Sequence, residues 1–314
     1  MESLTPAPSE GGVPRAGAPA PAGAALRAGV APPPFATITI VGLGLIGGSI
    51  ALGLRECWPA CRIVGVDRQA VLSHALGSSA IDRGVASMAE APASDLVILA
   101  APVSQNVRLL EEVAARVEET TLVTDVGGTK RDIVAAAREV ASSLAFVGGH
   151  PIGGGERGGF GFARPDLFVN RPWIFTPDDR APAARVERLF VLARALGARP
   201  TRMDAERHDR LMAYLSHLTQ LTATALMHVT GGQVSADGLR LAGRGLVDTT
   251  RLASSPANVW TEICAANSDL IGEALDQLIE TLTTMRAHLN DTTTIEAIFH
   301  DAARWRAELL KTGL

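Results

Sequence analysis

A glycine-rich turn between a predicted strand and a predicted helix constrains the fold most strongly. Residues 35–41 are rich in β-branched side chains, and residues 50–56 have helical spacing. Between them the chain reads Gly-Leu-Gly-Leu-Ile-Gly-Gly-Ser. Gly42 permits a tight turn, Gly44 lets a phosphate approach the backbone, and Gly47 lets the helix pack closely on the strand. The turn therefore predicts the first strand and helix of a dinucleotide-binding domain.

An acidic residue completes this fingerprint. Asp67 ends a second predicted strand, residues 62–66, twenty residues after Gly47. A carboxylate there accepts hydrogen bonds from adenosine ribose hydroxyls and repels a 2′-phosphate, which favours NAD over NADP. The neighbouring Arg68 is the opposing signal, because a guanidinium can accommodate that phosphate. We expect cofactor contacts at the three turn glycines and at Leu45, Ile46, Asp67, Arg68, Ala101, Pro102 and Asp125.

The remaining pattern predicts an α/β chain with an N-terminal Rossmann-type, doubly wound parallel sheet and an all-α C-terminal domain. Further strands are expected at residues 96–100, 121–124, 145–147, 173–176 and 199–203, with helical patterns between them. After Asp204, a plausible helix N-cap, there is no convincing strand. Ser255 and Pro256 are expected as N-cap and first residue of a later helix. These patterns divide the chain into three predicted regions: a disordered Ala/Pro/Gly-rich tail at 1–34, a dinucleotide-binding domain at 35–203, and a helical substrate and dimerisation domain at 204–314.

Composition excludes several classes of protein. Apolar residues make up 47% of the 314, and the net charge of −4 gives no electrostatic reason for a nucleic-acid partner. The uncharged stretch 28–54 has the length of a membrane span, but three prolines at 32–34 and five glycines within 42–53 favour a tail, strand and turn instead. The three cysteines of the whole chain form neither a disulfide framework nor a metal pattern. We therefore expect a cytoplasmic protein without a membrane segment or bound metal.

Three polar segments are candidates for chemistry. His150 lies among glycines at the predicted end of a strand, and imidazole suits proton transfer near neutral pH. Ser216 and His217 interrupt an apolar helix face, where a core histidine with satisfied hydrogen bonds is the simpler interpretation. Arg251 has small polar neighbours and suits a carboxylate ligand. The structural alternative for Arg251 is a helix-end arginine that pairs with Asp248 or Glu262. The alternative for His150, taken alone, is a structural histidine in a loop.

These segments together resemble the prephenate/arogenate dehydrogenase family. The turn is similar to that family's GLGLIGGS, and residues 148–156 to its GGHPIAGxE segment. Residues 216–218 match its SHL segment, and residues 248–260 its DxTRxAxSxPxxW segment. The resemblance runs from about residue 35 to the region of residue 290, and the last three segments in this order are specific to the family.

The resemblance implies NAD-dependent oxidation and decarboxylation of prephenate or arogenate in tyrosine biosynthesis. It implies that His150 is the catalytic base and that Arg251 holds a substrate carboxylate. It also places Ser216, His217 and Glu156 near the substrate, with Glu156 pairing with Arg251. Activity would then rise with pH through a group near the usual histidine value of about 6.5.

The chain departs from the family pattern at a few positions. Gly128 stands where the family commonly has a serine, and the neighbouring Thr129 is the candidate replacement for its hydroxyl. Gly153 replaces an alanine, and Thr219 a proline. We expect no regulatory ACT domain, which many relatives carry after the helical region. A non-catalytic NAD-binding sensor would explain Gly128, whereas a β-hydroxyacid dehydrogenase would need a lysine in the helical domain, and Lys311 near the terminus is the only one there.

An apolar seam near the C-terminus concerns assembly. Its residues are spaced four and three apart, the heptad period of packed helices, at Ile271, Leu275, Leu278, Leu282, Met285 and Leu289. An ordinary buried helix face explains so short a seam as well as a partner chain does. The resemblance implies a homodimer through the helical domain.

Overall fold

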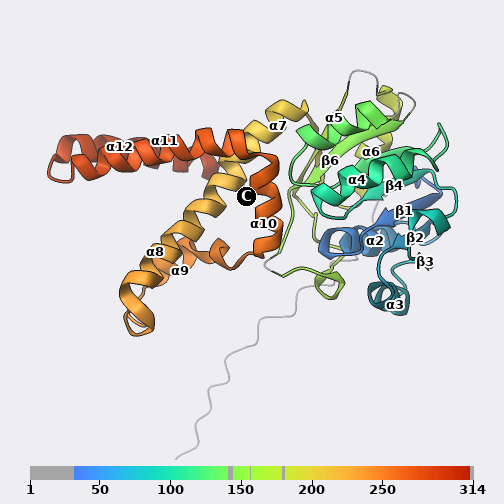
Figure 1. Ribbon diagram of the computed structural model, residues 1–314, viewed down its shortest axis with the longest axis horizontal. Helices are drawn as coiled ribbons and strands as arrows, with labels where there is room; N and C mark the ends of the chain where they lie inside the picture. The colour runs from blue at the N-terminus through green and yellow to red at the C-terminus, as the bar shows by residue number, and fades with distance from the viewer. Residues whose placement is uncertain (1–31, 141–143, 156, 179–180, 312–314) are drawn as a thin grey trace, which may run out of the picture.

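An eight-stranded sheet forms the first part of the molecule (Figure 1). The computed structural model describes residues 32–140, 144–155, 157–178 and 181–311, so most of the predicted tail at 1–34 lies outside the described residues. The strands are β1 (Thr37–Val41), β2 (Arg62–Val66), β3 (Arg83–Val85), β4 (Leu96–Leu99), β5 (Leu122–Asp125), β6 (Ala145–Pro151), β7 (Pro172–Pro177) and β8 (Arg199–Arg202). Their order is β3-β2-β1-β4-β5-β6-β7-β8, and neighbouring strands are parallel except β6 and β7. The predicted doubly wound fold is confirmed, with one antiparallel pair in its sheet.

Helices cover both faces of this sheet. One face packs against α2 (Leu45–Cys57), α3 (Gln69–Gly77) and α6 (Ala183–Ala195), and the other against α4 (Val103–Ala114) and α5 (Arg131–Val140). Strand β4 reads Leu-Val-Ile-Leu with all four residues buried, as expected for a strand covered on both sides. Each such side chain contributes about 1.5–3 kcal/mol of hydrophobic stabilisation when fully buried.

The strand order places a crevice at the carboxyl ends of β1 and β4. The chain leaves β1 toward β2 on one side and returns to β4 on the other, which is the topological switch point of such sheets. There the Ala100 N–H donates to the Val41 carbonyl over 2.7 Å. The residues that follow both strands therefore lie side by side.

Two strand predictions need correction. Strand β3 was missed, because three residues are too few to show an alternating pattern. Strand β6 extends to Pro151, so His150 lies within a strand and not in the loop after it. The cause is Gly148 and Gly149, which weaken the strand pattern although their backbones pair with Thr176 and Phe175 of β7.

From residue 204 onward the described chain is helical. Its elements are α7 (Ala205–Met212), a π-helical turn (Ala213–Leu218), α8 (Thr219–Leu239), α9 (Arg244–Thr249), a 3₁₀ turn (Arg251–Ser254), α10 (Ala257–Ala266), α11 (Ser268–Ala287) and α12 (Thr292–Leu310). Asp204 caps α7 as predicted and accepts from the Arg207 N–H over 2.7 Å. The predicted cap at Ser255 is wrong: α10 begins one residue later, after Pro256, and the Ser255 hydroxyl donates to the Gln220 side chain over 3.1 Å. No helix within the described ranges is both long and apolar enough to cross a membrane.

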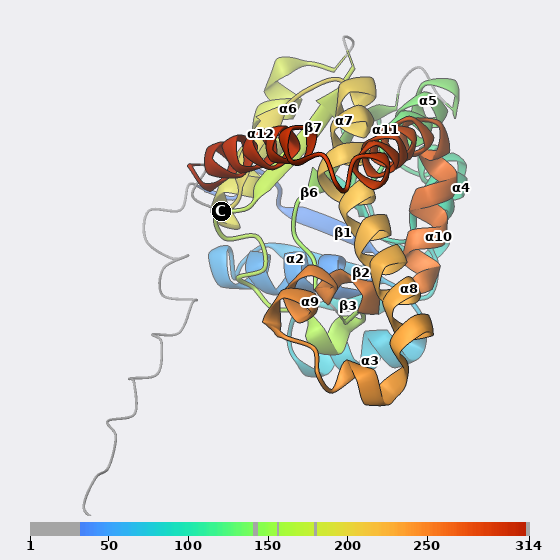
Figure 2. The same cartoon turned by 90° about the vertical axis from the view of Figure 1, so that its left-hand side faces the viewer.

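Helices α11 and α12 project away from the sheet domain (Figure 1), on the side that faces the viewer in Figure 2. The base of α11 packs into a small core that includes Ala213, Leu270 and Ile271. Farther out, the predicted seam emerges into solvent, with Leu282 54% and Leu289 71% exposed. Helix α12 buries none of its residues against the described part of the chain.

Candidate active site

The glycine turn has the close contacts that its sequence predicted. Gly42 has a φ of +92°, and a Cβ there would lie 2.7 Å from the Ala100 carbonyl carbon. A Cβ on Gly47 would lie 2.0 Å from the Gly42 carbonyl oxygen, so only glycine fits. A Cβ on Gly44 would meet no atom within 4 Å, so this backbone is open to a ligand. No side chain within the described part of the chain caps the start of α2 after Gly44, which leaves its first N–H groups available to an anion.

Asp67 lies directly beside this turn. Its carboxylate accepts from the Leu43 N–H and from the Arg68 N–H, each over 2.7 Å. The Arg68 side chain is 91% exposed, and its Nε is 3.9 Å from the Asp67 carboxylate. The turn and the second strand thus meet as the fingerprint requires.

A cleft of about 790 Å³ runs from the glycine turn to the helical domain. The Rossmann side contributes residues of the turn, His150 of β6 and residues of the segments after β4, β5 and β6, among them Gly44, Leu45, Ile46, Ala101, Pro102, Gly127, Gly128, Gly153, Gly154 and Arg157. The helical side contributes Gln220, Arg251, Leu252, Ser255, Pro256, Asn258, Val259, Trp260, Glu262 and Ile263. The predicted histidine and arginine, about a hundred residues apart in sequence, therefore line one cavity together with the predicted cofactor turn.

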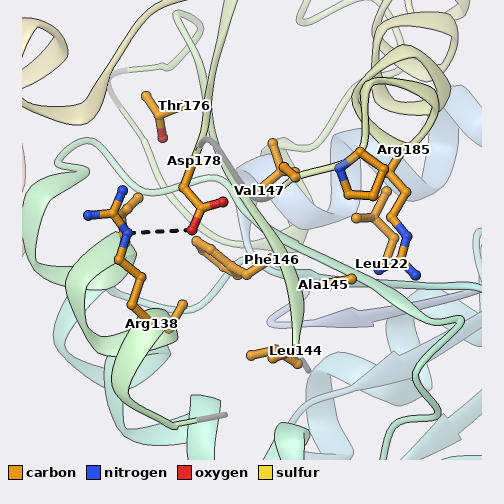
Figure 3. A pocket seen from close by; sticks show the side chains of 13 residues that line it. Leu122, Arg138, Leu144, Ala145, Phe146, Val147, Thr176, Asp178 and Arg185 are labelled. Atoms are coloured by element: carbon orange, nitrogen blue, oxygen red, sulfur yellow. Dashed lines mark ion pairs between the residues drawn. The ribbon is translucent and has the colours of Figure 1, made fainter. Parts of the chain in front are cut away.

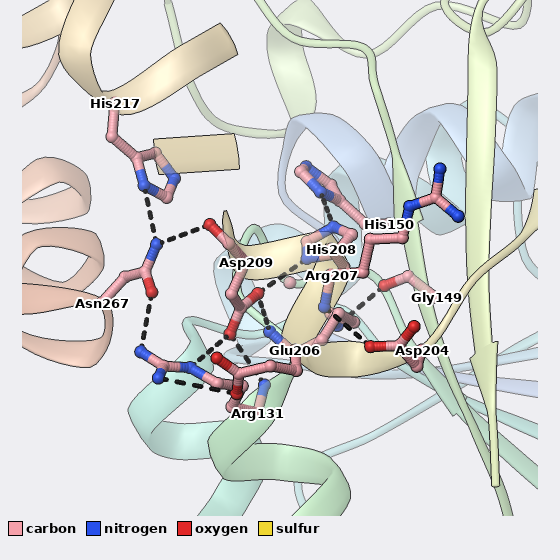
Figure 4. A network of polar contacts seen from close by, with 12 residues as sticks. Arg131, Gly149, His150, Asp204, Glu206, Arg207, His208, Asp209, His217 and Asn267 are labelled. Carbon is pink, nitrogen blue, oxygen red and sulfur yellow. Dashed lines mark hydrogen bonds and ion pairs between the residues drawn. The ribbon is translucent and has the colours of Figure 1, made fainter. Parts of the chain in front are cut away.

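His150 is held by a chain of two further polar residues (Figure 4). Its Nδ1 is 2.9 Å from Nε2 of His208, and Nδ1 of His208 is 2.7 Å from Oδ1 of Asp209. Both partners come from α7 and are fully buried. Asp209 also accepts from the N–H groups of Lys130 and Arg131, over 2.8 and 2.9 Å, and so caps α5.

Desolvation holds the pKa of His150 well below its usual range, and the charges of His208, Lys130 and His217 lower this pKa further. Desolvation also lowers the pKa of His208, although the hydrogen bond to Asp209 opposes this effect. His150 is therefore a neutral imidazole over most of the pH range. This moves the expected midpoint of its titration below the ordinary histidine value.

On the helical side, Arg251 and Gln220 lie at the cleft wall. The Gln220 amide donates to the Leu252 carbonyl over 2.7 Å, which ties α8 to the 3₁₀ turn that begins at Arg251. The carboxylate of Glu262 accepts from the Ser104 hydroxyl over 3.1 Å, which connects α10 to the start of α4. These contacts fix the helical wall against the sheet domain.

Two residues that were expected to contact the cofactor or the substrate are instead buried beneath the cleft. Asp125 is fully buried and pairs with the equally buried Lys130; it also accepts from the N–H groups of Gly127 and Gly149, over 2.8 and 3.1 Å. It therefore shapes the loops beside the cleft and does not line it. Thr129 is 1% exposed, its hydroxyl has no hydrogen-bond partner among the described residues, and it is not one of the residues that line the cleft. Thr129 therefore does not replace the serine hydroxyl that Gly128 lacks.

The SHL segment also lies behind the wall. His217 is 2% exposed, its Nδ1 is 3.2 Å from the Asn267 amide, and burial lowers its pKa to about 4. Neither His217 nor Ser216 lines the cleft, so the simpler interpretation of a core histidine describes this segment. The expectation for Glu156 falls outside the described residues.

Sequence reasoning missed His208, Asp209 and Gln220. A His-Asp pair in the first turns of a helix has no sequence signal that separates it from a solvated face. Gln220 lies one turn after Ser216, so its position on the helix was the only available signal.

A second, smaller cavity of about 160 Å³ lies between α5, β6 and the start of α6 (Figure 3). The Arg138 Nε and the Asp178 carboxylate are 3.5 Å apart at its edge. It contains none of the predicted site residues. No group of three potential metal ligands occurs among the described residues.

A nucleotide turn at the switch point, joined by one cleft to a histidine and a helical wall, defines a two-domain dehydrogenase with a Rossmann domain. Comparison with known proteins agrees. The family model for the "prephenate dehydrogenase, nucleotide-binding domain" matches residues 50–201, and the model for the "prephenate dehydrogenase, dimerization domain" matches residues 204–300. The chain belongs to the prephenate dehydrogenase family.

Individual relatives extend along most of the chain. A prephenate dehydrogenase of Bacillus subtilis is 37% identical over 81% of this chain and 70% of its own length. The crystal structure of A. aeolicus prephenate dehydrogenase, in complex with hydroxyphenyl propionate and NAD+, superposes with a TM-score of 0.79 at 26% identity, covering 87% of this chain and 98% of that one. Synechocystis arogenate dehydrogenase gives a TM-score of 0.74 at 25% identity, over 87% of this chain and 99% of that one.

Proposed function

We propose that this protein is an NAD-dependent prephenate dehydrogenase, which converts prephenate and NAD+ to 4-hydroxyphenylpyruvate, carbon dioxide and NADH. The observation that carries the proposal is the single cleft shared by the glycine turn, His150 and Arg251. Family membership supports the same reaction.

His150 is the proposed base. In this reaction the ring carbon that bears the hydroxyl loses a hydride, and the hydroxyl proton moves to Nε2 of His150. The ring carboxylate then leaves as carbon dioxide, its bonding electrons enter the ring, and the proton can return to the same oxygen as the ring becomes aromatic. Only a neutral imidazole can accept that proton, and the lowered pKa of His150 supplies one.

Arg251 is the proposed anchor for the side-chain carboxylate of the substrate. Its guanidinium can form charge-assisted hydrogen bonds with a carboxylate. Part of the neighbouring lining is apolar, with Leu252, Val259 and Ile263. A ring carboxylate against such a wall is poorly solvated, which favours its loss as neutral carbon dioxide.

The residues present fit a bound NAD. Gly44 leaves the backbone open to a pyrophosphate, and the start of α2 offers uncapped N–H groups. Asp67 beside the turn suits the ribose hydroxyls and disfavours the extra phosphate of NADP. When bound, the nicotinamide supplies the hydride acceptor, and the protein's part is to hold substrate and acceptor at reacting distance.

The deciding experiment mixes the purified protein with NAD+ and prephenate and follows the absorbance of reduced nicotinamide. We expect NADH formation with release of carbon dioxide, and a much lower kcat/KM with NADP+. Binding of NAD+ without turnover would favour a non-catalytic sensor and contradict the proposal.

Arogenate is the second candidate substrate, because the Synechocystis structural neighbour is an arogenate dehydrogenase. The two compounds share the ring and differ at the side-chain keto or amino group. The ratio of kcat/KM for prephenate to that for arogenate, measured on one preparation, decides between them. A ratio below one would assign the chain to arogenate.

A homodimer through the helical domain is part of the proposal. Helix α12 leaves Phe299, Trp305 and Leu310 at least 59% exposed, and α11 leaves Ile279 and Leu282 more than half exposed. Such apolar surface on projecting helices suits a second copy of the chain, and the matched "dimerization domain" model supports it. We expect light scattering to give twice the chain mass, and Leu282→Glu to weaken the dimer more than Glu280→Gln. A monomeric protein at micromolar concentration would contradict this.

We also propose a cytoplasmic location. The three cysteines, Cys57, Cys61 and Cys264, are all free, which suits a reducing compartment. Fractionation of cells that produce the protein tests this, and recovery in the membrane or extracellular fraction would contradict it.

A further inference from the structure

We propose that His208 and Asp209 are positioning residues that fix the tautomer of His150, so that its Nε2 is left bare and faces the cleft as a proton acceptor. The inference rests on the proposed function, in which His150 is the base. It assigns a task to two buried residues of the helical domain that do not line the cleft. The chain of contacts can be followed in Figure 4.

The Asp209 carboxylate is surrounded by hydrogen-bond donors. Its Oδ1 accepts from the Lys130 N–H and its Oδ2 from the Arg131 N–H, while the Arg131 Nε is 3.4 Å away. Burial alone would raise the pKa of Asp209, but the hydrogen bonds from His208 and from these backbone groups lower it. An ionised carboxylate can only accept hydrogen bonds, so Nδ1 of His208, at 2.7 Å, must carry a hydrogen.

His208 is the next residue in this chain of contacts. The residue is fully buried, and burial keeps its ring neutral by lowering its pKa. A neutral imidazole carries one ring hydrogen, and that hydrogen already points from Nδ1 to Asp209. Its Nε2 is therefore an acceptor, and Nδ1 of His150, at 2.9 Å, must donate to it.

His150 is the last residue in this chain of contacts. With its hydrogen on Nδ1, the neutral ring has a lone pair on Nε2. This atom lies 4.0 Å from the position that a Cβ would take on Gly128, a residue of the cleft wall. The lone pair thus faces the space where a substrate hydroxyl would lie. Without the acceptor at His208 both tautomers of His150 become available, and the one with hydrogen on Nε2 cannot act as a base.

The arrangement follows the same logic as a carboxylate that orients a catalytic histidine, with one more imidazole between the two groups. The intermediate imidazole carries the orienting effect across the interface between α7 and β6. The tautomer of the base therefore depends on how the helical domain docks on the sheet domain.

The direct test is nitrogen-15 NMR of the histidine-labelled protein at neutral pH, because protonated and bare ring nitrogens give well-separated resonances. His150 is identified by the signals that disappear in His150→Asn. We expect hydrogen on Nδ1 and a bare Nε2 in His150 of the wild-type protein. Hydrogen on Nε2 would overturn the proposal, whether or not the enzyme turns over prephenate.

Two variants supply the kinetic readout. His208→Gln keeps an acceptor for His150, whereas His208→Leu removes it. We expect kcat to fall by about 10- to 100-fold in His208→Leu, a part of the 10²–10⁴-fold that a general base supplies, and by less than about threefold in His208→Gln. The KM for NAD+ should stay within about twofold in both variants, since neither residue lines the nucleotide turn.

The outcomes separate this proposal from the proposed function. Wild-type protein without activity, but with the expected His150 tautomer, would contradict the dehydrogenase assignment alone. An active enzyme in which both His208 variants lose kcat equally, or in which neither does, would overturn the positioning role. If His208→Leu does not fold, the wild-type NMR measurement and His208→Gln still decide.

Discussion

Replacing Gly128 by serine tests how the enzyme works without a hydroxyl beside its proposed base, His150. A Cβ at this position would lie 3.7 Å from the Ile263 side chain and 4.0 Å from Nε2 of His150, which are ordinary van der Waals distances. The φ of Gly128 lies outside the left-handed range, so a side chain adds no backbone strain. A serine hydroxyl, one bond beyond this Cβ, comes within hydrogen-bonding reach of Nε2 and of a substrate hydroxyl next to it.

The expected gain follows from the value of one positioned hydrogen bond. A neutral hydrogen bond contributes about 0.5–1.5 kcal/mol, which corresponds to an increase of about 2- to 12-fold in kcat/KM with prephenate. Gly128→Ala is the matched control, because it adds the Cβ without the hydroxyl. Both variants should be slightly more stable than the wild type, since a glycine replaced without strain gains about 0.4–1 kcal/mol.

The assay is the initial rate of NADH formation for the three proteins, with their melting temperatures measured alongside. Serine should exceed alanine in kcat/KM and equal it in stability. If the serine variant is no faster than the alanine variant, a hydroxyl at this position does not assist the reaction, and the geometric reasoning about Nε2 is refuted.

The remaining predictions concern His150, Arg251 and His217. His150→Asn should lower kcat by about 10²–10⁴-fold with little change in NAD affinity, and near wild-type turnover would remove its role as the base. Arg251→Ala should raise the KM for prephenate by about 10- to 100-fold, the worth of a charge-assisted hydrogen bond, whereas Arg244→Ala on α9 should not; equal effects would contradict the anchor. Because desolvation lowers the pKa of His150, kcat/KM should rise with pH through a group below about 6.5, and a midpoint above 7 would exclude His150 in its present environment. The pKa of His217 is about 4 in the folded protein and about 6.5 in the unfolded chain, so the contribution of this residue to stability is complete above pH 6.5 and is lost as the pH falls toward 4. Urea unfolding should show a loss of about 2 kcal/mol between pH 7 and 5 that His217→Gln does not show. A parallel loss in both proteins would contradict this prediction.

Parts of the molecule whose signal is local in sequence could be predicted. The glycine turn, Asp67 at the end of β2 and the Asp204 cap are each set by residues within a few positions or at a known spacing, and the structure has each of them where expected. Strand β3, with three residues, carries too little pattern to detect.

Features that depend on the packing of distant segments could not be predicted. His208 and Asp209 acquire their roles because α7 docks against β6 and α5, a contact that no local pattern encodes. Asp125 ends a strand, as many ligand-binding acids do, but it is buried and pairs with the buried Lys130. The SHL segment, expected near the substrate, instead packs against Asn267, because a π-helical turn determines which side chains point inward there.

The cap that Asp209 places on α5 limits how the two halves of the enzyme can move. A hinge that opened the halves would expose the N–H groups of Lys130 and Arg131 and break the ion pair from Arg131 to Asp269 on α11. Each lost hydrogen bond to a charged group costs about 1.5–3 kcal/mol, so wide opening is rare at equilibrium. We therefore expect substrate to enter without wide opening of the two halves, and exchange of these two amides with solvent deuterium to be as slow as that of the central strands.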